Sequence, residues 1–553
     1  RLAEHLDPEE LRDLLAQYQD ACANVIEHFD GHIARYVGDG LLVYFGYPQA
    51  HEDDAQRGVR AGLGIVEAIK SLNPKFTNPG VDLAVRIGIT TGLVVAGDIG
   101  SGERVEEKAI VGETPNLAAR LQALAEPNAV VIGDDTQRLV EGLFESEDLG
   151  PQNLKGISQS VAAYRVRAES SAPSSFEAKA ARGLTPLVGR EEEIGLLLKR
   201  WAEATDGEGQ VVLLSGEAGI GKSRIVRAFR DHLEVEPHNR VLYYGSPYHR
   251  NSAFYPAIDQ LERGLRFQKG DSSRERFDKL DAVLENLGLP LEEHAFPLAS
   301  LLSLPVNDRY SPLELSPEQL KKRIFESLVA VIESMASQHP VLMVVEDIHW
   351  IDPSTQEFIS LLMEQLQIDR FFLVVTCRPE FESPWGGYAH ITSLTLNRLS
   401  RKASVAMIAR VTGGKAVPDE VRDQIVAKTD GVPLFVEELT KTVLESNLLE
   451  DVGDRYVLLG PLPSLAIPAS LQDSLMARLD RLASVKEVAQ LAATLGRTFT
   501  HELLAAVSPL NDKELQHAIT QLMKAELLYR HGLPPDVTYE FKHALVQDAA
   551  YQS

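Results

Sequence analysis

Hydrophobic residues follow two different spacings in the first 166 residues, and the change between them predicts the local structure. In three segments apolar residues recur every three or four positions, as on one face of a helix, whereas five shorter runs have the spacing of strands. Helices interleaved with strands predict an α/β sandwich. The expected helices are 8–28, 52–71 and 115–125, and the expected strands are 33–37, 41–46, 83–89, 129–132 and 160–166.

A stretch rich in Ser, Ala and Pro, residues 167–186, shows neither spacing and predicts a linker. After it, QVVLLSGEAGIGKSRIVRAF runs from an apolar strand through a Gly-rich turn into a helix. Three more apolar runs, RVLYYGS, VLMVVED and FFLVVTCR, are separated by helical stretches, which predicts a parallel sheet. From about residue 395 the pattern is mainly helical, with short strands expected near ELLYRHG and VTYEFKH.

Length and charge narrow the class of protein. A chain of 553 residues is too long for one hydrophobic core, so we expect three or more domains. Acidic residues outnumber basic ones by 80 to 55, giving a formal net charge of -25, which argues against nucleic acid as the main partner. No apolar run approaches the roughly 20 residues that cross a bilayer, so we expect a cytoplasmic protein without membrane segments.

The two cysteines and the start of the chain allow two further predictions. Cys22 and Cys377 lie in different expected domains, which fits two buried thiols in a reducing compartment. The chain starts without Met, and Asp7 and Pro8 have the features of a helix N-cap and first turn. We therefore expect a further segment before Arg1.

The Gly-rich turn GEAGIGKS completes the pattern GxxxxGK[ST] between a strand and a helix. Its glycines let backbone N–H groups surround a phosphate, the Lys ammonium neutralises the outer phosphates, and the Ser hydroxyl ligates Mg²⁺. A chance glycine turn before Lys-Ser is the weaker alternative, because strand, turn and helix are all in order. The candidate residues are Gly216, Gly221, Lys222 and Ser223.

Such a loop also needs an acidic residue at the end of a neighbouring strand. VLMVVEDIHWID supplies Glu346 and Asp347 after five apolar residues. Which acid holds the metal and which polarises water stays open, because the order is Glu-Asp. Arg378 ends another apolar strand and could sense the γ-phosphate, or be an ordinary exposed arginine.

Four motifs, LVGREEEI, VVEDIHWID, VVTCRPE and DGVPLFVEELT, together resemble the STAND class of P-loop ATPases, AAA-like switches that regulate an attached domain. The resemblance covers residues 184–553. It implies ATP or ADP at the P-loop, a helical lid and a winged-helix-like tail, with helical repeats and a sensor or partner protein bound beyond residue 553. It implies roles at the nucleotide for Val188 and Arg190 near the adenine, for Pro433 in the lid, and for His543 at an ADP phosphate, unless His543 is a buried or surface histidine.

In the first domain, ARYVGDGLLVYFG places Asp39 between two glycines where two apolar runs meet. Asp-Gly favours a β-hairpin turn, and a hairpin tip can also present its carboxylate to a metal. Further along, Asn116 and Arg120 lie four residues apart on one expected helix face, a pairing that suits the equatorial charge of a phosphorane. Lys155 lies at the lip of the last strand.

Five motifs in this order, YVGDGLLVYFG, HEDDAQRGVRAGL, VRIGITTG, VGETPNLAARL and LKG, resemble the class III nucleotidyl cyclases from residue 1 to about 166. The resemblance implies a ferredoxin-like fold and a two-metal reaction, with Mg²⁺ or Mn²⁺, that converts ATP to cyclic AMP and pyrophosphate. Asp39 then corresponds to a metal ligand, Asn116 and Arg120 to transition-state stabilisers and Lys155 to the triphosphate-binding lysine. Sites of this family lie between two domains, which implies a homodimer.

This sequence departs from the family pattern at several points. The first strand, with a second metal aspartate, is expected before Arg1, so this segment alone is expected to be nearly inactive. At the base pocket Arg35 replaces the usual lysine and keeps a donor, whereas Ala109 cannot accept from the adenine amine, which leaves ATP or GTP open. The acidic run Glu52, Asp53 and Asp54 is expected to start a helix rather than to form a metal cluster.

These patterns predict an α/β multidomain protein. The expected domains are 1–166, cyclase; 167–186, linker; 187–395, P-loop ATPase; 396–465, helical lid; and 466–553, winged-helix-like. The leading hypothesis is an adenylate cyclase regulated by its ATPase. The alternatives are a degenerate cyclase domain that serves dimerisation or nucleotide sensing in a signalling scaffold, and a transcription activator, which the acidic charge disfavours.

Overall fold

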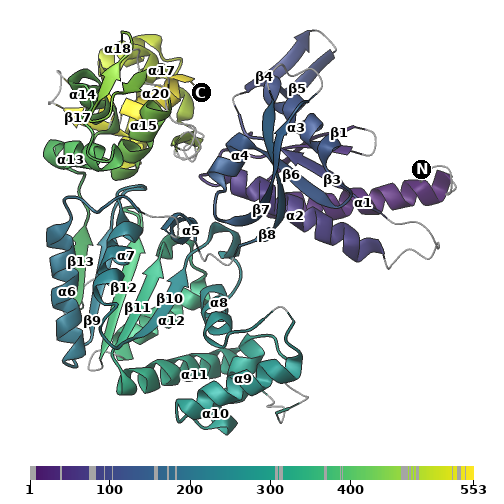
Figure 1. Ribbon diagram of the computed structural model, residues 1–553, viewed down its shortest axis with the longest axis vertical. Coiled ribbons are helices and arrows are strands. Elements are labelled where there is room, and N and C mark those ends of the chain that lie inside the picture. Colours follow the sequence, from purple (N-terminus) through teal and green to yellow (C-terminus); the bar gives the residue numbers. More distant parts are fainter. Residues whose placement is uncertain are drawn as a thin grey trace. The chain divides into compact units, whose positions relative to one another are not determined.

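The computed structural model divides into two compact units, which are treated separately below (Figure 1). The first unit comprises residues 1–184, 411–430 and 435–553, and the second comprises 185–410 and 431–434. The structure describes residues 8–37, 40–73, 83–92, 94–101, 104–154, 160–170, 174–180, 184–268, 270–305, 309–310, 315–365, 370–385, 388, 390–446, 448–461, 471, 475–476, 479–480, 485–525, 527–531, 537–541 and 544–552.

The N-terminal part of the first unit is an α/β sandwich built on a four-stranded sheet of order β3-β6-β8-β7. The β3 and β6 strands are parallel, and the remaining neighbours are antiparallel. The strands are β3 (Arg86–Ile89), β6 (Ala129–Gly133), β7 (Phe144–Gln152) and β8 (Val161–Glu169).

Helices cover both faces of this sheet because its central strands bury alternate residues on opposite sides. Val130 and Ile132 of β6 pack in one core with the apolar faces of α1 (Pro8–His28) and α2 (Asp54–Leu72). Val131 points into a second core with Leu121 of α3 (Glu113–Leu124). The helix α4 (Asp134–Leu139) follows β6 directly. The predicted helix 8–28 and the predicted α/β sandwich are therefore confirmed.

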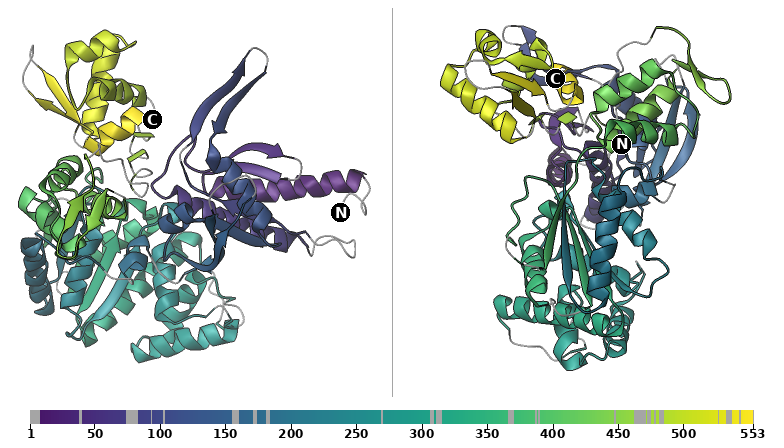
Figure 2. Two further views of the ribbon diagram at one scale, coloured as in Figure 1. Left: turned by 45° about the horizontal axis from the view of Figure 1, so that its top comes forward. Right: turned by 90° about the vertical axis from the view of Figure 1, so that its left-hand side faces the viewer.

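Two hairpins accompany the sandwich. Strands β1 (His32–Val37) and β2 (Gly40–Tyr44) pair antiparallel, with Val37 opposite Gly40, so the predicted hairpin is confirmed. Strands β4 (Val95–Ser101) and β5 (Arg104–Val111) form a ribbon that extends away from the sheet (Figure 2). The sequence predicted a strand that ends at Gly112, and β5 ends one residue before it, whereas β4 and β7 were not predicted.

The segment 167–186, expected to be a linker, contains ordered structure. Strand β8 continues to Glu169, and a short helix, α5 (Ser175–Ala180), follows. The Ser174 hydroxyl accepts a hydrogen bond from the Glu177 N–H at 3.2 Å, and Ala178 is buried with the core of the sandwich. A single buried alanine is too small a signal for a periodic pattern, which explains why the sequence predicted a linker.

The second unit contains a five-stranded, fully parallel sheet of order β10-β11-β12-β9-β13. The strands are β9 (Gln210–Ser215), β10 (Asn239–Tyr244), β11 (Val341–Glu346), β12 (Phe371–Cys377) and β13 (Ile391–Thr395). Strands β11 and β12 are buried at every position, which confirms the prediction from their continuous apolar runs. The edge strand β13 alternates in burial and was not predicted.

Helices pack on both faces of this parallel sheet (Figure 1). Ile194 and Phe229 share one core with Val344 and Phe372 of the sheet, whereas Leu280 and Phe358 share the other with Met343. Helices α6 (Glu191–Thr205) and α7 (Lys222–His232) cover the first face. The other elements are η3 (Pro247–His249), α8 (Tyr255–Gly264), α9 (Ser273–Asn286), α10 (Leu291–Leu301), α11 (Pro317–Gln338), η5 (Ile348–Trp350), α12 (Pro353–Gln365) and α13 (Arg401–Val411).

The C-terminal part of the first unit is mainly helical, as predicted from residue 395 onward. A three-stranded antiparallel sheet of order β16-β18-β17 lies among its helices, with β17 and β18 at the two expected positions. The elements are α14 (Asp419–Thr429), α15 (Pro433–Glu445), β14 (Leu449–Asp451), β15 (Tyr456–Leu458), α17 (Lys486–Leu495), β16 (Thr498–Thr500), α18 (His501–Val507), α19 (Asp512–Lys524), β17 (Leu528–His531), β18 (Thr538–Phe541) and α20 (Ala544–Gln552).

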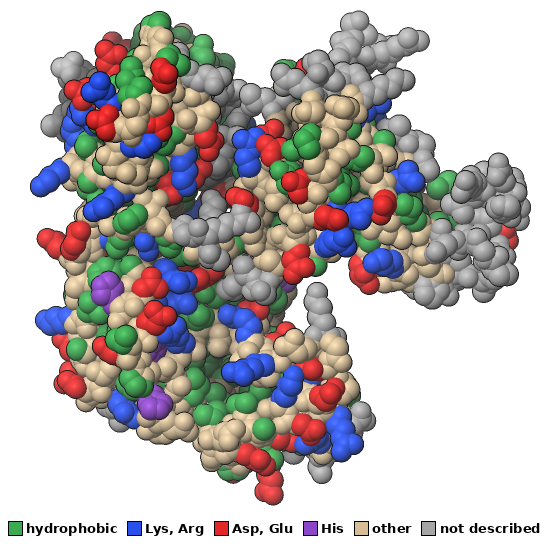
Figure 3. Space-filling model, viewed as in Figure 1, with side chains coloured by type: hydrophobic (Ala, Val, Ile, Leu, Met, Phe, Trp, Pro, Cys, Tyr) green, Lys and Arg blue, Asp and Glu red, His purple; other side chains and the backbone are tan. Residues whose placement is uncertain are grey.

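On the face shown in Figure 3, acidic and basic side chains are interspersed over both α/β regions. Among the residues that the structure describes, no helix is both long and apolar enough to cross a membrane.

Candidate functional site

The helix that carries Asn116 and Arg120 lies directly on the backbone of β3. A Cβ atom at Gly88 would lie 2.2 Å from the Gln122 nitrogen and 2.3 Å from the Ala118 carbonyl oxygen. Backbone atoms cannot move aside as a flexible side chain can, so only glycine permits this approach. The glycine of VRIGITTG thus fixes the height of α3 above the sheet.

Asn116 and Arg120 are both exposed on α3. The Asn116 amide donates a long 3.5 Å hydrogen bond to the Gly112 carbonyl, at the start of its own helix. Residues four apart lie on the same helix face, so a neutral donor and a guanidinium project together from the sandwich. This pair has the chemistry to stabilise negative charge on a phosphate.

The other expected cyclase residues are described only in part. Asp39 and Lys155 lie outside the described residues, and for Ala109 the structure describes the backbone, in β5 opposite Gly97. Arg35 is exposed on β1, next to a register shift in the β1–β2 ladder. Within the described ranges no group of three His, Cys, Asp or Glu side chains is arranged for a metal ion, so the metal role of Asp39 stays a prediction.

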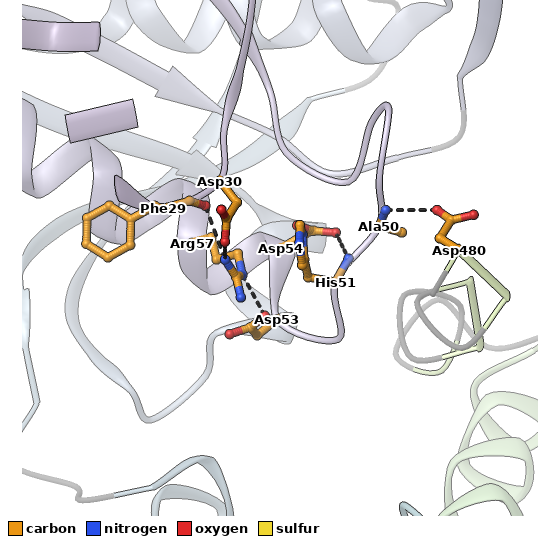
Figure 4. A network of polar contacts seen from close by, with 8 residues as sticks. All are labelled: Phe29, Asp30, Ala50, His51, Asp53, Asp54, Arg57 and Asp480. Carbon is orange, nitrogen blue, oxygen red and sulfur yellow. Dashed lines mark hydrogen bonds and ion pairs between the residues drawn. The ribbon is translucent and has the colours of Figure 1, made fainter. Parts of the chain in front are cut away.

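A buried arginine that the sequence did not single out braces the base of the β1–β2 hairpin (Figure 4). The Arg57 guanidinium, only 6% exposed, forms an ion pair with Asp30 in the α1–β1 turn. Its Nε donates to Asp53 at 2.8 Å, on the turn that starts α2. Arg57 therefore joins the residues immediately before the hairpin to the helix that follows it.

The acidic run before α2 is a helix start, as predicted. Helix α2 begins at Asp54, whose carboxylate accepts hydrogen bonds from the His51 N–H at 2.6 Å and the His51 ring at 3.0 Å. One residue earlier, the Ala50 N–H donates to the buried carboxylate of Asp480 at 2.8 Å (Figure 4). Asp53 and Asp54 thus accept hydrogen bonds from groups of the protein itself: Asp53 from Arg57, and Asp54 from His51.

In the second unit the Gly-rich turn between β9 and α7 contains two glycines in left-handed conformations. Gly219 and Gly221 adopt φ angles of +76° and +103°, which side chains rarely tolerate. The Lys222 ammonium is buried and donates to the carbonyls of Gly216 at 2.9 Å and Glu217 at 3.0 Å. The lysine is therefore folded back over the turn, at the N-terminus of α7, where helix N–H groups favour an anion.

The two acids after β11 differ in their surroundings. Glu346 is buried, and its carboxylate accepts a 2.5 Å hydrogen bond from the Ser223 hydroxyl. Asp347 has a left-handed backbone, φ +53°, and its N–H donates to the Thr376 hydroxyl at 2.9 Å. A hydroxyl and a carboxylate oxygen in contact are the ligands that Mg²⁺ prefers, so Ser223 and Glu346 fit this cation.

Strand β12 separates the P-loop strand from the acidic strand, and its end contributes to the same region. The Arg378 guanidinium lies 5.7 Å from the centre of the Trp350 ring. Cys377, which precedes it, is buried, and burial raises the pKa of its thiol. The structure therefore places Arg378 at the carboxyl end of the sheet, while its role at a γ-phosphate stays a prediction.

Arg190 lies beside the P-loop and makes its contacts with groups of the protein itself. Its guanidinium is buried and donates to the Ile220 carbonyl at 3.2 Å and the Asn397 carbonyl at 2.7 Å, with Glu193 as its ion-pair partner. Arg190 thus fastens the P-loop to the segment after β13. Val188, two residues earlier, is partly buried, and proximity of either residue to an adenine stays a prediction.

The residues around Pro433 contact the P-loop directly. The Leu434 N–H donates to the Gly219 carbonyl at 3.2 Å, and a Cβ atom at Gly219 would lie 3.0 Å from that of Leu434. Pro433 itself is the first residue of α15, where a proline is favoured. Contact of Pro433 with a nucleotide stays a prediction, and His543 lies outside the described residues.

Two contributors to this site were missed by the sequence interpretation. Arg398 forms an ion pair of 3.4 Å with Glu217, inside the P-loop, and Thr376 holds the backbone of Asp347. The partners are separated by 181 positions in the first case and 29 in the second, so no local pattern links them. The position of Thr376 at a strand end, beside Cys377 and Arg378, was the available signal.

Family models cover most of the chain. A model described as the adenylate and guanylate cyclase catalytic domain matches residues 1–168, and one described as an AAA ATPase domain matches 186–375. A third, a domain of unknown function, matches 400–456. The chain therefore contains a cyclase catalytic domain followed by an AAA ATPase domain.

Two curated relatives align with nearly the whole chain, and a third aligns with part of it. An uncharacterized protein of Rhizobium meliloti is 28% identical over 99% of this chain and 52% of its own length. Adenylate cyclase type 10 of Oryctolagus cuniculus is 21% identical over 96% of this chain and 36% of its own length. Adenylate cyclase 1 of Rhizobium meliloti is 27% identical over 30% of this chain and 25% of its own length. The chain thus spans about half, or less, of these relatives.

Proposed function

We propose that this protein is an adenylate cyclase that converts ATP to cyclic AMP and pyrophosphate, at a site shared by the cyclase domains of two copies. The observation that carries the proposal is the exposed pair Asn116 and Arg120, which Gly88 holds at a fixed height above the sheet. The match of residues 1–168 to the cyclase catalytic family and the adenylate cyclases among the relatives support it.

The chemistry assigns a role to each residue. Attack by the ribose 3′ oxygen on the α-phosphate places extra negative charge on the phosphoryl oxygens, which Arg120 and Asn116 stabilise from one face. Lys155 holds the triphosphate, and Arg35 donates to the base. Mg²⁺ or Mn²⁺ held by Asp39 would supply Lewis-acid activation of the attacking oxygen and neutralise the leaving pyrophosphate.

The second part of the proposal concerns the ATPase, which we assign as a STAND-type switch that binds ATP or ADP and controls the cyclase. The bent-back Lys222 and the contact between Ser223 and Glu346 support a nucleotide site with Mg²⁺. The helices and three-stranded sheet of the C-terminal part suit a lid and a winged-helix-like domain, acting in the cytoplasm.

The direct test is a turnover assay on the purified full-length protein, with Mg-ATP, Mn-ATP or the GTP complexes and chromatographic separation of the products. We expect cyclic AMP from the wild type and a loss of about 100-fold in Arg120→Ala, the cost of removing one donor to a transition-state oxyanion. Arg138→Ala, an exposed arginine of α4 paired with Asp135, is the control and should retain full activity.

Two results would contradict the proposal. One is the absence of any cyclic nucleotide under all metal and nucleotide conditions, which would favour a degenerate cyclase domain. The other is full activity in Arg120→Ala. Preferential production of cyclic GMP would overturn the assignment of ATP as substrate while leaving the cyclase reaction in place.

A further inference from the structure

The turn between α14 and α15 comes shortly before Leu434, which contacts the P-loop, and the backbone of this turn is unusual. Asp430 and Gly431 adopt successive left-handed conformations, with φ angles of +49° and +75°. A Cβ atom at Gly431 would lie 2.3 Å from the Leu399 carbonyl oxygen, so the position requires glycine. The Leu399 N–H donates to the Gly431 carbonyl at 2.8 Å, which fixes the turn to the segment after β13.

The carboxylate of Asp430 in this turn pairs with Arg497, the residue before β16. Both oxygens of Asp430 accept from one nitrogen of the Arg497 guanidinium, at 2.9 and 3.1 Å. The Nε of Arg497 lies 3.3 Å from Glu540 of β18, and the Arg497 carbonyl accepts from the Phe541 N–H at 2.9 Å. Arg497 is therefore held at both its backbone and its side chain.

These contacts meet at a single peptide bond. Asp430 is hydrogen-bonded to Arg497, which immediately precedes β16, whereas residues 431–434 belong to the second unit and Leu434 contacts Gly219 of the P-loop. Aspartate is one of the few residues other than glycine that adopt the left-handed region readily. Its side chain is short, so the position of its carboxylate depends closely on the backbone of the turn. We therefore expect loss of the ion pair to displace the turn, and displacement of the turn to weaken the ion pair.

We propose that Asp430 is a positioning residue for the nucleotide site: its ion pair with Arg497 holds Gly431–Leu434 against the P-loop and so sets the affinity for bound nucleotide. The inference rests on the proposed binding of ATP or ADP at the P-loop. Because coupling between two sites is reciprocal, bound nucleotide also strengthens the attachment of the C-terminal sheet at Asp430. The C-terminal domain thereby reports the nucleotide state.

A second ion pair on the same helix provides a matched control. Lys428, two residues before Asp430 on α14, pairs with Asp548 of α20 at 2.8 Å. The two pairs join α14 to the same C-terminal domain and have comparable burial, with the side chains of Lys428 and Asp430 16% and 17% exposed. Of these two pairs, only the Asp430–Arg497 pair adjoins the turn. If breaking a pair merely loosened the C-terminal part, loss of either pair would weaken nucleotide binding. If Asp430 positions the turn, only loss of its own pair would do so.

The test is an equilibrium titration of the full-length protein with a fluorescent ADP analogue, on wild type, Asp430→Asn, Arg497→Gln, the double variant and Lys428→Gln. Asparagine retains the left-handed conformation and removes the charge, so the variant isolates the ion pair. We expect each single change at the pair to raise the Kd about fivefold, within the range of ordinary allosteric coupling. The double variant should be no weaker than either single one, because the two changes remove one interaction.

The controls distinguish the possible failures. Arg497→Lys, which keeps the charge, should restore most of the affinity, and Lys428→Gln should leave the Kd within twofold of wild type. Wild-type affinity in both Asp430→Asn and Arg497→Gln, or an equal loss in Lys428→Gln, would overturn this inference alone. A folded wild type that binds no ADP would contradict the proposed nucleotide site and the inference together.

Discussion

Glu346 and Asp347 show how neighbouring carboxylates receive different tasks from the backbone. Their order left the metal ligand open in the sequence, because either acid could follow a buried strand. The left-handed φ of Asp347 turns the chain immediately after β11, and the Glu346 carboxylate remains against the Ser223 hydroxyl. This contact favours Glu346 over Asp347 as the ligand of a Mg²⁺ ion, and the assignment stays a prediction.

This assignment predicts a difference between two conservative substitutions. Mg²⁺ should strengthen the binding of ATP to the wild type. In Glu346→Gln this Mg²⁺-dependent gain in affinity should fall by at least about tenfold, since the substitution removes an anionic oxygen ligand. Asp347→Asn should retain that enhancement. Isothermal titration with ATP in Mg²⁺ and in EDTA checks both, and the reverse pattern would assign the metal to Asp347.

The two thiols are a second case at this scale, since burial controls their chemistry. Cys22 is 1% exposed, and burial raises its thiol pKa to about 11; burial also raises the pKa of Cys377. Because the thiolate is the reactive form, a raised pKa lowers reactivity at any pH below it. At pH 8 a thiol with a pKa of about 11 is ionised to about one part in a thousand.

We therefore predict that both thiols resist alkylation in the native protein. Treatment with iodoacetamide at pH 8, followed by peptide mass spectrometry, should leave Cys22 and Cys377 unmodified, while both react in guanidinium chloride. Rapid modification of either residue in the native state would show that its surroundings are open to solvent.

At the scale of elements, the placement of α3 depends on a glycine in the strand beneath it. Gly88→Ala would force backbone atoms of α3 away from β3, because the added carbon would meet the Gln122 nitrogen at 2.2 Å. We predict a loss of stability of about 1–3 kcal/mol, the usual cost of overpacking, and a larger fall in cyclase activity than the fraction unfolded explains.

Gly58→Ala is the matched control for this prediction. Gly58 is buried in α2 of the same domain, and an added Cβ would meet only side-chain atoms, at 3.4 Å and beyond. Thermal unfolding and cyclic AMP production should both stay close to wild type. Equal effects of the two substitutions would show that the domain is sensitive to any added methyl group and would remove the special role of Gly88.

The elements that the sequence predicted are those with one unbroken pattern. Helix 8–28 has a continuous apolar face, and β11 is apolar throughout because helices cover both sides of the parallel sheet. Strand β4 was not predicted because VAGDIGS is interrupted by glycines and an aspartate, and β13 was not predicted because an edge strand is half exposed. Periodicity reports burial, so elements with little burial leave little signal.

Candidate site residues could likewise be predicted only where a local sequence pattern marks them. Gly216, Lys222 and Ser223 were predictable because phosphate binding needs them at a fixed local spacing. Arg57 and Arg398 were not, because their carboxylate partners are brought near by folding. Arg190 was expected near the adenine, which stays a prediction; the structure shows that its guanidinium donates to the carbonyls of Ile220 and Asn397.

The whole chain combines two proposed nucleotide sites, one in the cyclase domain and one in the ATPase domain. The cyclase site is incomplete in a single copy, because residues that stabilise the transition state and residues that hold the metal come from different copies in the proposed dimer. Asp430 lies at one of the points where the chain passes from one unit to the other, and its carboxylate is hydrogen-bonded to Arg497. In the proposed switch, the nucleotide state of the ATPase changes how two cyclase domains pair.

The central claim, cyclic AMP synthesis at a site shared by two copies, is tested most directly by complementation. Asp39→Ala and Arg120→Ala subunits of the full-length protein, co-expressed with different affinity tags and purified through both, form mixed dimers. Each mixed dimer has one site with both changes and one with neither, so it should show about half the wild-type rate, while each variant alone is nearly inactive. Mixed dimers no more active than the single variants, beside an active wild type, would contradict the shared site.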